Sequence, residues 1–199
     1  MTSLKSLTDD LERELASLSP AHRVAFAALC SERLLPVYGT FSRMEAWGDA
    51  AVLRRGLDAV WNWLAGRSPS RQLVQDLIDA CEAAAPDTEE FSSAYASAAL
   101  NAAAAVVEAL ECCLDGSVEH AVQAATLSID TIWMHVQARD GVAGSVVAEA
   151  KVLGDPAILR ETRRQDDDLA HLKRMRTLDP SALKSLRDSS RGHAVLEHS

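Results

Sequence analysis

The sequence predicts an all-α, single-domain protein: an irregular multi-helix bundle of about seven to nine helices with a central alanine-rich helix. Three observations predict this fold. The 199 residues include few Gly, Pro and aromatic residues while 48% are hydrophobic, a composition that favours helix and can form a core. Apolar residues recur at steps of three and four, and no segment alternates with a period of two. Ser-Pro and Asp-Pro pairs mark several helix starts.

The first two helices are predicted from a leucine stripe and a Ser-Pro pair. Residues 3–18 form an amphipathic helix, because one face carries Leu4, Leu7, Leu11, Leu15 and Leu18. Ser19 then caps a second helix whose first residue is Pro20. We expect Pro36 to end that helix, because proline has no backbone N–H to donate, and residues 38–47 to form a connection.

Two further helices follow in the same manner. Asp49 opens the third helix, and Gly66 ends it as the glycine of its C-terminal cap. Ser68 and Pro69 repeat the Ser-Pro signal before a fourth helix that reaches about Ala85.

The alanine-rich segment is predicted as the centre of the bundle. A long helix covers about residues 88–114, and its many alanines permit close approach of neighbouring backbones. Ser117 caps the next helix, which ends near Gly141, and a shorter helix covers residues 145–153.

The C-terminal region is predicted to be less well packed. Asp155-Pro156 caps a long helix in which Glu161 to Asp168 is charged on all sides, so we expect this part to project or to pair with a partner. A short turn follows Asp179-Pro180. We predict a helical domain over residues 1–187 and a disordered tail over residues 188–199, which lacks apolar periodicity.

Charge and cysteine content exclude several classes of protein. A net charge of −9 opposes binding to nucleic acid and to anionic membranes. The four cysteines lack the spacing of a disulfide scaffold, and the N-terminus lacks a secretory signal, so we expect a cytoplasmic protein. Residues 94–114 approach the length of a membrane span, but Glu108 and Glu111 favour a buried helix of a soluble protein.

Several short motifs resemble one bacterial family. Cys30-Ser31-Glu32-Arg33-Leu34-Leu35-Pro36-Val37-Tyr38, followed by Phe41, resembles the C-x-E-R-x-x-P-x-Y-x-x-F signature of the YjaG-like proteins, a family of unknown function (DUF416). Further matches are Gly48-Asp49, Arg54-Arg55-x-Leu57-Asp58-x-x-Trp61, Ala85-Pro86 with Phe91, and Glu119-His120-Ala121-Val122. The resemblance covers about residues 20–137 and implies an all-helical fold but no activity. A site shared by the family is therefore expected in the first two thirds of the chain.

Arg33 is the residue that most strongly suggests a site. It falls on the apolar stripe of the second helix, and an unpaired buried guanidinium would cost several kcal/mol, so we expect a carboxylate partner, with Asp58 beside Trp61 as the candidate. The favoured hypothesis is that Arg33 forms an internal ion pair, and the alternative is that it belongs to an anion pocket with Tyr38 and Arg54. For either hypothesis the candidate residues are Glu32, Arg33, Tyr38, Arg54, Asp58 and Trp61.

Motifs for metal, cofactor or nucleophilic chemistry are not found in the sequence. No Glu-x-x-His motif occurs, and Asp168-x-x-His171 lies in a segment expected to be solvated, so we predict no metal site. We also expect no cofactor, because the chain has neither a P-loop nor a G-x-G-x-x-G motif. Cys112 and Cys113 point about 100° apart on a helix and are expected to fill the core.

Two functional hypotheses follow. The leading one is a non-enzymatic protein-interaction module, an adaptor or immunity-type binding protein, that forms homodimers or binds another protein. The alternative is a small-molecule or anion-binding protein, or an enzyme, that uses a pocket around Arg33, Asp58 and Trp61.

Overall fold

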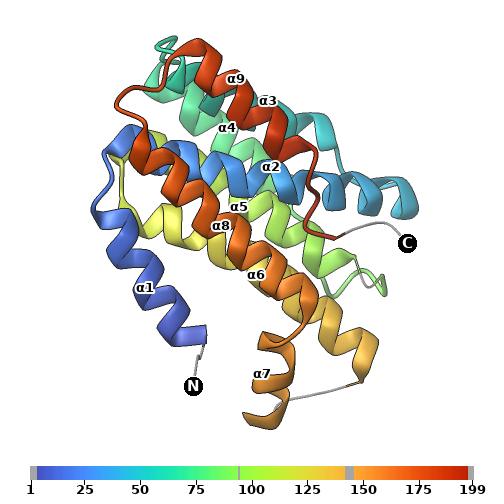
Figure 1. Cartoon of the computed structure of the whole chain (residues 1–199). Helices are drawn as coiled ribbons and strands as arrows, with labels where there is room; N and C mark the ends of the chain where they lie inside the picture. The colour runs from blue at the N-terminus through green and yellow to red at the C-terminus, as the bar shows by residue number, and fades with distance from the viewer. Residues whose placement is uncertain (1–3, 94, 142–145, 197–199) are drawn as a thin grey trace.

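The protein is an all-α bundle with one hydrophobic core, seen here in a computed structural model that describes residues 4–93, 95–141 and 146–196 (Figure 1). The described residues form nine helices and no strand, which confirms the predicted fold class. The helices are α1 (Leu4–Ala16), α2 (Pro20–Glu45), α3 (Ala50–Leu64), α4 (Arg71–Ala83), α5 (Ala96–Asp115), α6 (Val118–Asp140), α7 (Val146–Leu153), α8 (Pro156–Arg174) and α9 (Pro180–Arg191).

The centre of the bundle is the packed pair α2 and α5, around which α3, α4 and α6 lie (Figure 1). Small side chains let these helices approach closely: Ala99, Ala102 and Ala103 of α5 are completely buried. By length and composition α5 could cross a membrane, but more than half of it is buried inside the bundle. It is therefore a core helix of the bundle.

The predicted capping residues explain most helix starts. Ser19, Asp49, Ser117, Asp155 and Asp179 each accept a hydrogen bond from a backbone N–H of the helix that follows. The fourth helix starts later than predicted, because its N-cap is Ser70 rather than a residue of the preceding Ser-Pro pair. The predicted start of the short seventh helix at residue 145 lies outside the described residues.

Two predicted helix boundaries were wrong. The second helix continues through Pro36 to Glu45, so the predicted connection over residues 38–47 is largely helical. Packing around α2 outweighs the local cost of proline, since Val37, Tyr38 and Phe41 are buried beyond it. The alanine-rich helix begins at Ala96 rather than at residue 88, because residues 84–93 form turns.

The C-terminal region is better packed than predicted. Helix α9 extends to Arg191, the Ser190 hydroxyl donates to the Leu29 carbonyl at 2.7 Å, and the Val195 N–H donates to the Arg33 carbonyl at 3.0 Å. The prediction of a disordered tail is therefore corrected for residues 188–196, and residues 197–199 lie outside the described part of the chain. The charged segment of α8 does not project either, because its Glu161 and Asp168 side chains bind Arg33 of α2, although Asp166 and Asp167 are exposed.

Candidate functional site

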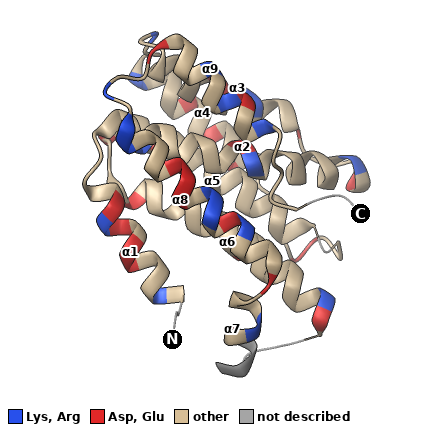
Figure 2. Ribbon diagram, viewed as in Figure 1, with Lys and Arg blue, Asp and Glu red and all other residues tan. Residues whose placement is uncertain are grey.

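Helix α2 carries two neighbouring charged residues into the interior on different sides. Glu32 is 1% exposed and Arg33 is 2% exposed. Consecutive residues of a helix point about 100° apart, so Arg33 faces α8 whereas Glu32 faces α3 and α9. Figure 2 shows the alternating acidic and basic segments of α8 and α9, the two helices that supply most of the partners.

Arg33 is held in a closed network with α8. Its Nε and Nη2 atoms donate to Glu161 Oε1 at 3.1 and 3.0 Å, and its Nη1 donates to Asp168 Oδ2 at 2.7 Å. Gln165 also donates to Glu161 Oε1, at 3.1 Å. The predicted partner Asp58 is therefore wrong, although the predicted burial of Arg33 is correct. We call Arg33, Glu161, Gln165 and Asp168 the Arg33 network.

Carboxylates outnumber cations in the Arg33 network. Burial raises the pKa of Asp168, Arg33 offsets part of that rise, and the neighbouring Glu161 charge adds to it. Among the described residues, the second oxygen of Glu161, Oε2, is buried without a hydrogen-bond partner. This network thus has more acceptors than donors, and Arg33 itself lines none of the three hollows identified in the described part of the chain.

Glu32 lies in the opposite arrangement, a carboxylate surrounded by donors. Arg54 of α3 binds it with a two-pronged contact at 2.8 and 2.9 Å, and Trp61 Nε1 donates to it at 2.9 Å. From α9, Arg187 Nε donates at 3.0 Å and Arg191 Nε at 3.3 Å. Bidentate guanidinium–carboxylate contacts are among the stronger hydrogen bonds in proteins.

Asp58 completes this second cluster on the solvent side. It pairs with Arg187, lies 3.8 Å from Arg54 and lies 4.0 Å from Arg191. The Arg187 guanidinium also sits 5.6 Å from the Trp61 ring centroid, in cation–π geometry. We call Glu32, Arg54, Asp58, Trp61, Arg187 and Arg191 the Glu32 cluster.

The electrostatics of the Glu32 cluster favour an ionised Glu32. Burial opposes ionisation, but the hydrogen bond from Arg54 and the charges of Arg54, Arg191 and Arg187 outweigh it, so the pKa of Glu32 is lowered. Three guanidiniums meet two carboxylates, so the ionised cluster carries one positive charge in excess.

A cleft of about 410 Å³ opens beside the Glu32 cluster. Arg54 and Arg191 border it with side chains 31% and 44% exposed, and the buried Glu32 lies at its base. The rest of its lining is apolar or small: Leu35, Pro36, Ala50 and Ala51. The cleft therefore combines charged donors on one side with an apolar wall on the other.

Tyr38 lies outside this site. Its hydroxyl donates to the Ala84 carbonyl at 2.6 Å, and its ring packs edge-on to Phe41 at 6.2 Å. Phe41 in turn contacts Trp47 and Phe91 at 5.9 and 5.1 Å. The structure thus assigns Tyr38 to an aromatic cluster of the core, and of the six predicted residues it brings together Glu32, Arg54, Asp58 and Trp61.

The charged side chains that border the cleft are better suited to hydrogen bonding and charge pairing than to proton transfer. Arginine stays charged at all physiological pH values and offers N–H donors but no acceptor, so it cannot serve as a general base. The carboxylate nearest the cleft base, Glu32, is saturated by donors. In the part of the chain that the structure describes, no group of three metal-ligating side chains gathers.

Four charged residues of these sites were missed by the sequence analysis: Glu161, Asp168, Arg187 and Arg191. The signal was present as spacing, because Glu161, Asp168 and the buried Leu172 recur at helical steps on one face of α8. Arg187 and Arg191 likewise stand one turn apart on α9.

The fold and these two buried ion clusters define an all-helical bundle without recognisable catalytic apparatus in its described residues. The model for the family described as "Protein of unknown function (DUF416)" matches residues 10–195, and the chain belongs to that family.

Relatives and a solved structure agree with that assignment. The chain is 27% identical to "Uncharacterized protein YjaG" of Escherichia coli (strain K12) over 182 residues, which cover 91% of each chain. The protein of the same description from Salmonella typhimurium is 26% identical over the same length. A crystal structure of a DUF416 family protein from Shewanella baltica OS155 superposes with a TM-score of 0.82 at 22% identity, covering 90% of this chain and 92% of the other, which shows the shared fold.

Proposed function

We propose that this protein binds a small organic monocarboxylate in the cleft bordered by Arg54 and Arg191. One observation supports the proposal above all others: a buried cluster with a surplus of guanidinium groups opens onto a cleft with an apolar wall. This is the anion-binding alternative of the sequence analysis, moved from Arg33 to its neighbour Glu32.

Hydrogen-bond capacity supports an acceptor-rich ligand. Each guanidinium has five N–H donors, and a carboxylate has about four lone-pair sites. Glu32 already accepts five hydrogen bonds, so its capacity is used. Among the described hydrogen bonds Arg191 donates only through Nε, and its Nη2 lies 4.0 Å from Asp58 Oδ1, which leaves Nη1 as the terminal amino group for a ligand in the cleft.

The excess of one positive charge selects the charge of the ligand. A monocarboxylate neutralises the cluster, whereas a phosphate dianion would leave a negative charge beside Glu32. Leu35 and Pro36 then provide contact for a short apolar tail.

Titration with butyrate, followed by the side-chain Nε–H NMR signals of arginine, tests the proposal. Butyrate is expected to shift the signals of Arg54 and Arg191, while butylamine, of similar shape and opposite charge, shifts neither. Arg191→Gln should weaken butyrate about tenfold, because one charge contact near a surface contributes about 1–4 kcal/mol. Inorganic phosphate should bind more weakly than butyrate.

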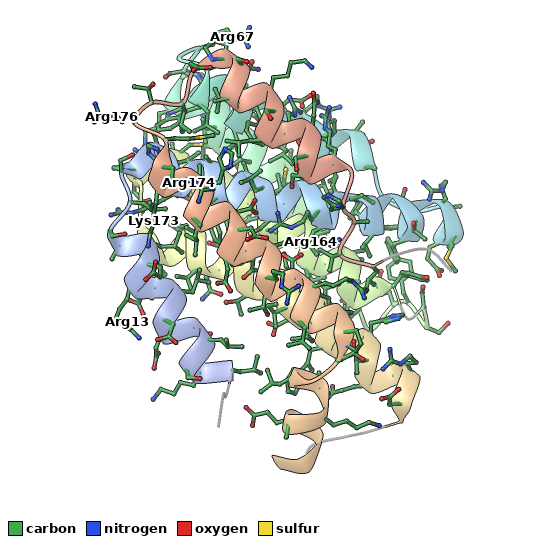
Figure 3. The ribbon with its side chains drawn as sticks, viewed as in Figure 1. Arg13, Arg67, Arg164, Lys173, Arg174 and Arg176 are labelled. Atoms are coloured by element: carbon green, nitrogen blue, oxygen red, sulfur yellow. The ribbon has the colours of Figure 1, made fainter. Side chains whose placement is uncertain are left out.

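A matched control variant comes from the opposite end of α3. Arg67 is exposed, follows the last residue of α3 and lies at the top of the view in Figure 3, whereas the cleft is lined by Ala50 and Ala51 of the first turn, so Arg67→Gln changes the net charge equally without touching the cleft. Butyrate affinity should stay unchanged in this control. The proposal would be overturned if butyrate did not bind, or if it bound no better than butylamine. It would also be overturned if Arg191→Gln and Arg67→Gln lowered butyrate affinity equally, and the cluster would then have a structural role.

The proposal includes a cytoplasmic location and a non-enzymatic role. The four cysteines are free, and three of them are buried, which suits a reducing compartment. Fractionation of cells that express the tagged protein tests the location, with recovery in the soluble cytoplasmic fraction as the expected result. Recovery in the membrane or periplasmic fraction would contradict it.

A further inference from the structure

A second hollow lies on the other side of the bundle, between α1, α6 and α8. It encloses about 280 Å³, and its apolar lining consists of Leu4, Leu7, Leu11, Ala125, Ile129 and Leu169. Leu15 is the one residue of α1 that is fully buried, whereas Leu4, Leu7 and Leu11 remain partly exposed. The seam between α1 and α8 is therefore incompletely filled by the described side chains.

Helix α1 is fixed at both ends of this groove. At one end Glu14 pairs with Lys173 of α8, and at the other the Leu4 N–H donates to Glu149 of α7 at 3.3 Å. Between these contacts α1 runs beside α6 and α8 as the outer wall (Figure 1). The groove lies along about ten residues of α1, or about 15 Å, the length of roughly three helical turns.

The rim of the groove is acidic. Asp10, Glu14, Asp130 and Asp166 line it, and Figure 2 shows acidic segments on α1 and in the middle of α8. Asp10 pairs with Arg13 and Glu14 with Lys173. Asp130 and Asp166, in contrast, form no ion pair with any residue that the structure describes. Burial raises the pKa of both carboxyls, so each is partly desolvated without a cation to compensate it.

We propose that this groove binds an amphipathic helix of a partner protein, with leucine-like side chains in the apolar floor and lysine or arginine side chains at Asp130 and Asp166. The acidic rim selects a basic segment by charge complementarity. The elongated shape matches a helix laid along the groove, a recurring mode of peptide recognition. This site is independent of the carboxylate cleft, since no residue lines both.

A designed peptide of about three helical turns tests the proposal. It carries leucines at positions i, i+3, i+4 and i+7 with flanking lysines, and amide NMR signals of the full-length protein report where it binds. We expect shifts confined to α1, α6 and α8, and no binding of a peptide in which glutamates replace the lysines. Asp130→Asn/Asp166→Asn should weaken the basic peptide about tenfold or more.

Two variants keep this test decisive. Asp76→Asn/Asp79→Asn on α4 makes the same change in net charge away from the groove, so peptide affinity should be unchanged. Thr8→Trp leaves the charge unaltered and fills the groove, so it should block the peptide. Shifts on other helices, equal binding of the acidic peptide, or insensitivity to both groove variants would overturn the proposal. Dimer formation that protects the same residues would also overturn it, because a second copy would then be the occupant.

Discussion

The Arg33 network and the Glu32 cluster are built around adjacent residues of α2 and have opposite charge balances. In the first, one guanidinium meets two carboxylates inside the protein, and Glu161 Oε2 lacks a donor. In the second, two carboxylates meet three guanidiniums, donors are in excess, and the cluster opens onto a cleft. Similar side chains thus form a closed ion-pair network on one side of α2 and a cluster that borders a cleft on the other.

The difference teaches that exposure, rather than the presence of an ion pair, separates scaffolding from a candidate site. Both clusters attach the C-terminal helices to α2: Glu161 and Asp168 attach α8, and Arg187 and Arg191 attach α9. In the described residues only the Glu32 cluster presents charged donors to a cleft. Perturbing each cluster should therefore have different consequences.

The largest effect is expected for Arg33→Met. Removing the guanidinium leaves Glu161 and Asp168 without their cation, and breaking a buried pair in this way costs about 3–5 kcal/mol. Urea denaturation gives the change in the free energy of unfolding. The triple variant Arg33→Met/Glu161→Gln/Asp168→Asn should recover at least half of the loss. A cost below about 1 kcal/mol for the single variant would show that the network does not lock α8.

A smaller loss in the free energy of unfolding is expected for Glu32→Gln. We expect about 1.5–3 kcal/mol, the usual range for hydrogen bonds to charged groups. The arginines left behind can turn toward solvent through the cleft, which limits the loss. Comparing this variant with Arg33→Met by the same denaturation measurement tests the contrast between open and closed clusters. Equal losses would remove the basis for calling one cluster open.

The pH dependence of stability should have opposite signs at the two clusters. Glu32 has a lowered pKa, so its stabilisation is present above the usual glutamate pKa of about 4.3 and is lost as pH falls through the lowered value. Asp168 has a raised pKa, so its ionised form destabilises the fold at neutral pH, and that penalty is relieved as pH falls through the raised value.

Urea denaturation between pH 7 and about pH 2.5 measures these slopes, because the Glu32 contribution is lost only below the usual glutamate pKa. The stability gap between the wild type and Glu32→Gln should shrink on acidification, whereas the gap between the wild type and Asp168→Asn should shift in favour of the wild type. If the stability differences of both variants from the wild type changed with pH in the same direction, the proposed opposite roles of Glu32 and Asp168 would be contradicted.

The smallest stability effect is expected for Arg191→Gln, below about 1 kcal/mol, because the side chain is 44% exposed and exposed ion pairs contribute little. Thermal denaturation beside Arg67→Gln provides the measurement. A loss as large as that of Glu32→Gln would assign Arg191 a mainly structural role.

The sequence predicted the fold well because helices depend on local signals. The leucine stripe of α1 and the caps at Ser19, Ser117 and Asp155 are visible within a few residues, and the structure confirms them. Pro36 was misread for the opposite reason: a proline ends most helices, but burial of Tyr38 and Phe41 beyond it keeps α2 helical.

The pairing of charges could not be predicted in the same way. Arg33 was correctly expected to be buried, but its partners lie 128 and 135 residues away, and charge alone does not choose among many carboxylates. Glu161 occupies a buried position of α8 and Asp168 a partly buried one, where apolar residues are the usual signal, so the segment was predicted to be solvated. Arg187 was the last residue of the predicted domain and Arg191 lay in the predicted tail, because the sequence from Arg187 onward lacks apolar periodicity.

The most direct test of the proposed carboxylate site is a charge series at the Glu32 cluster. Asp58→Asn adds one positive charge to the cluster and Arg191→Gln removes one, so butyrate affinity should rise several-fold in the first and fall about tenfold in the second, relative to the wild type. Titration by NMR at constant ionic strength gives the three Kd values. Identical Kd values across the series, or the reverse order, would contradict a carboxylate site at the Glu32 cluster.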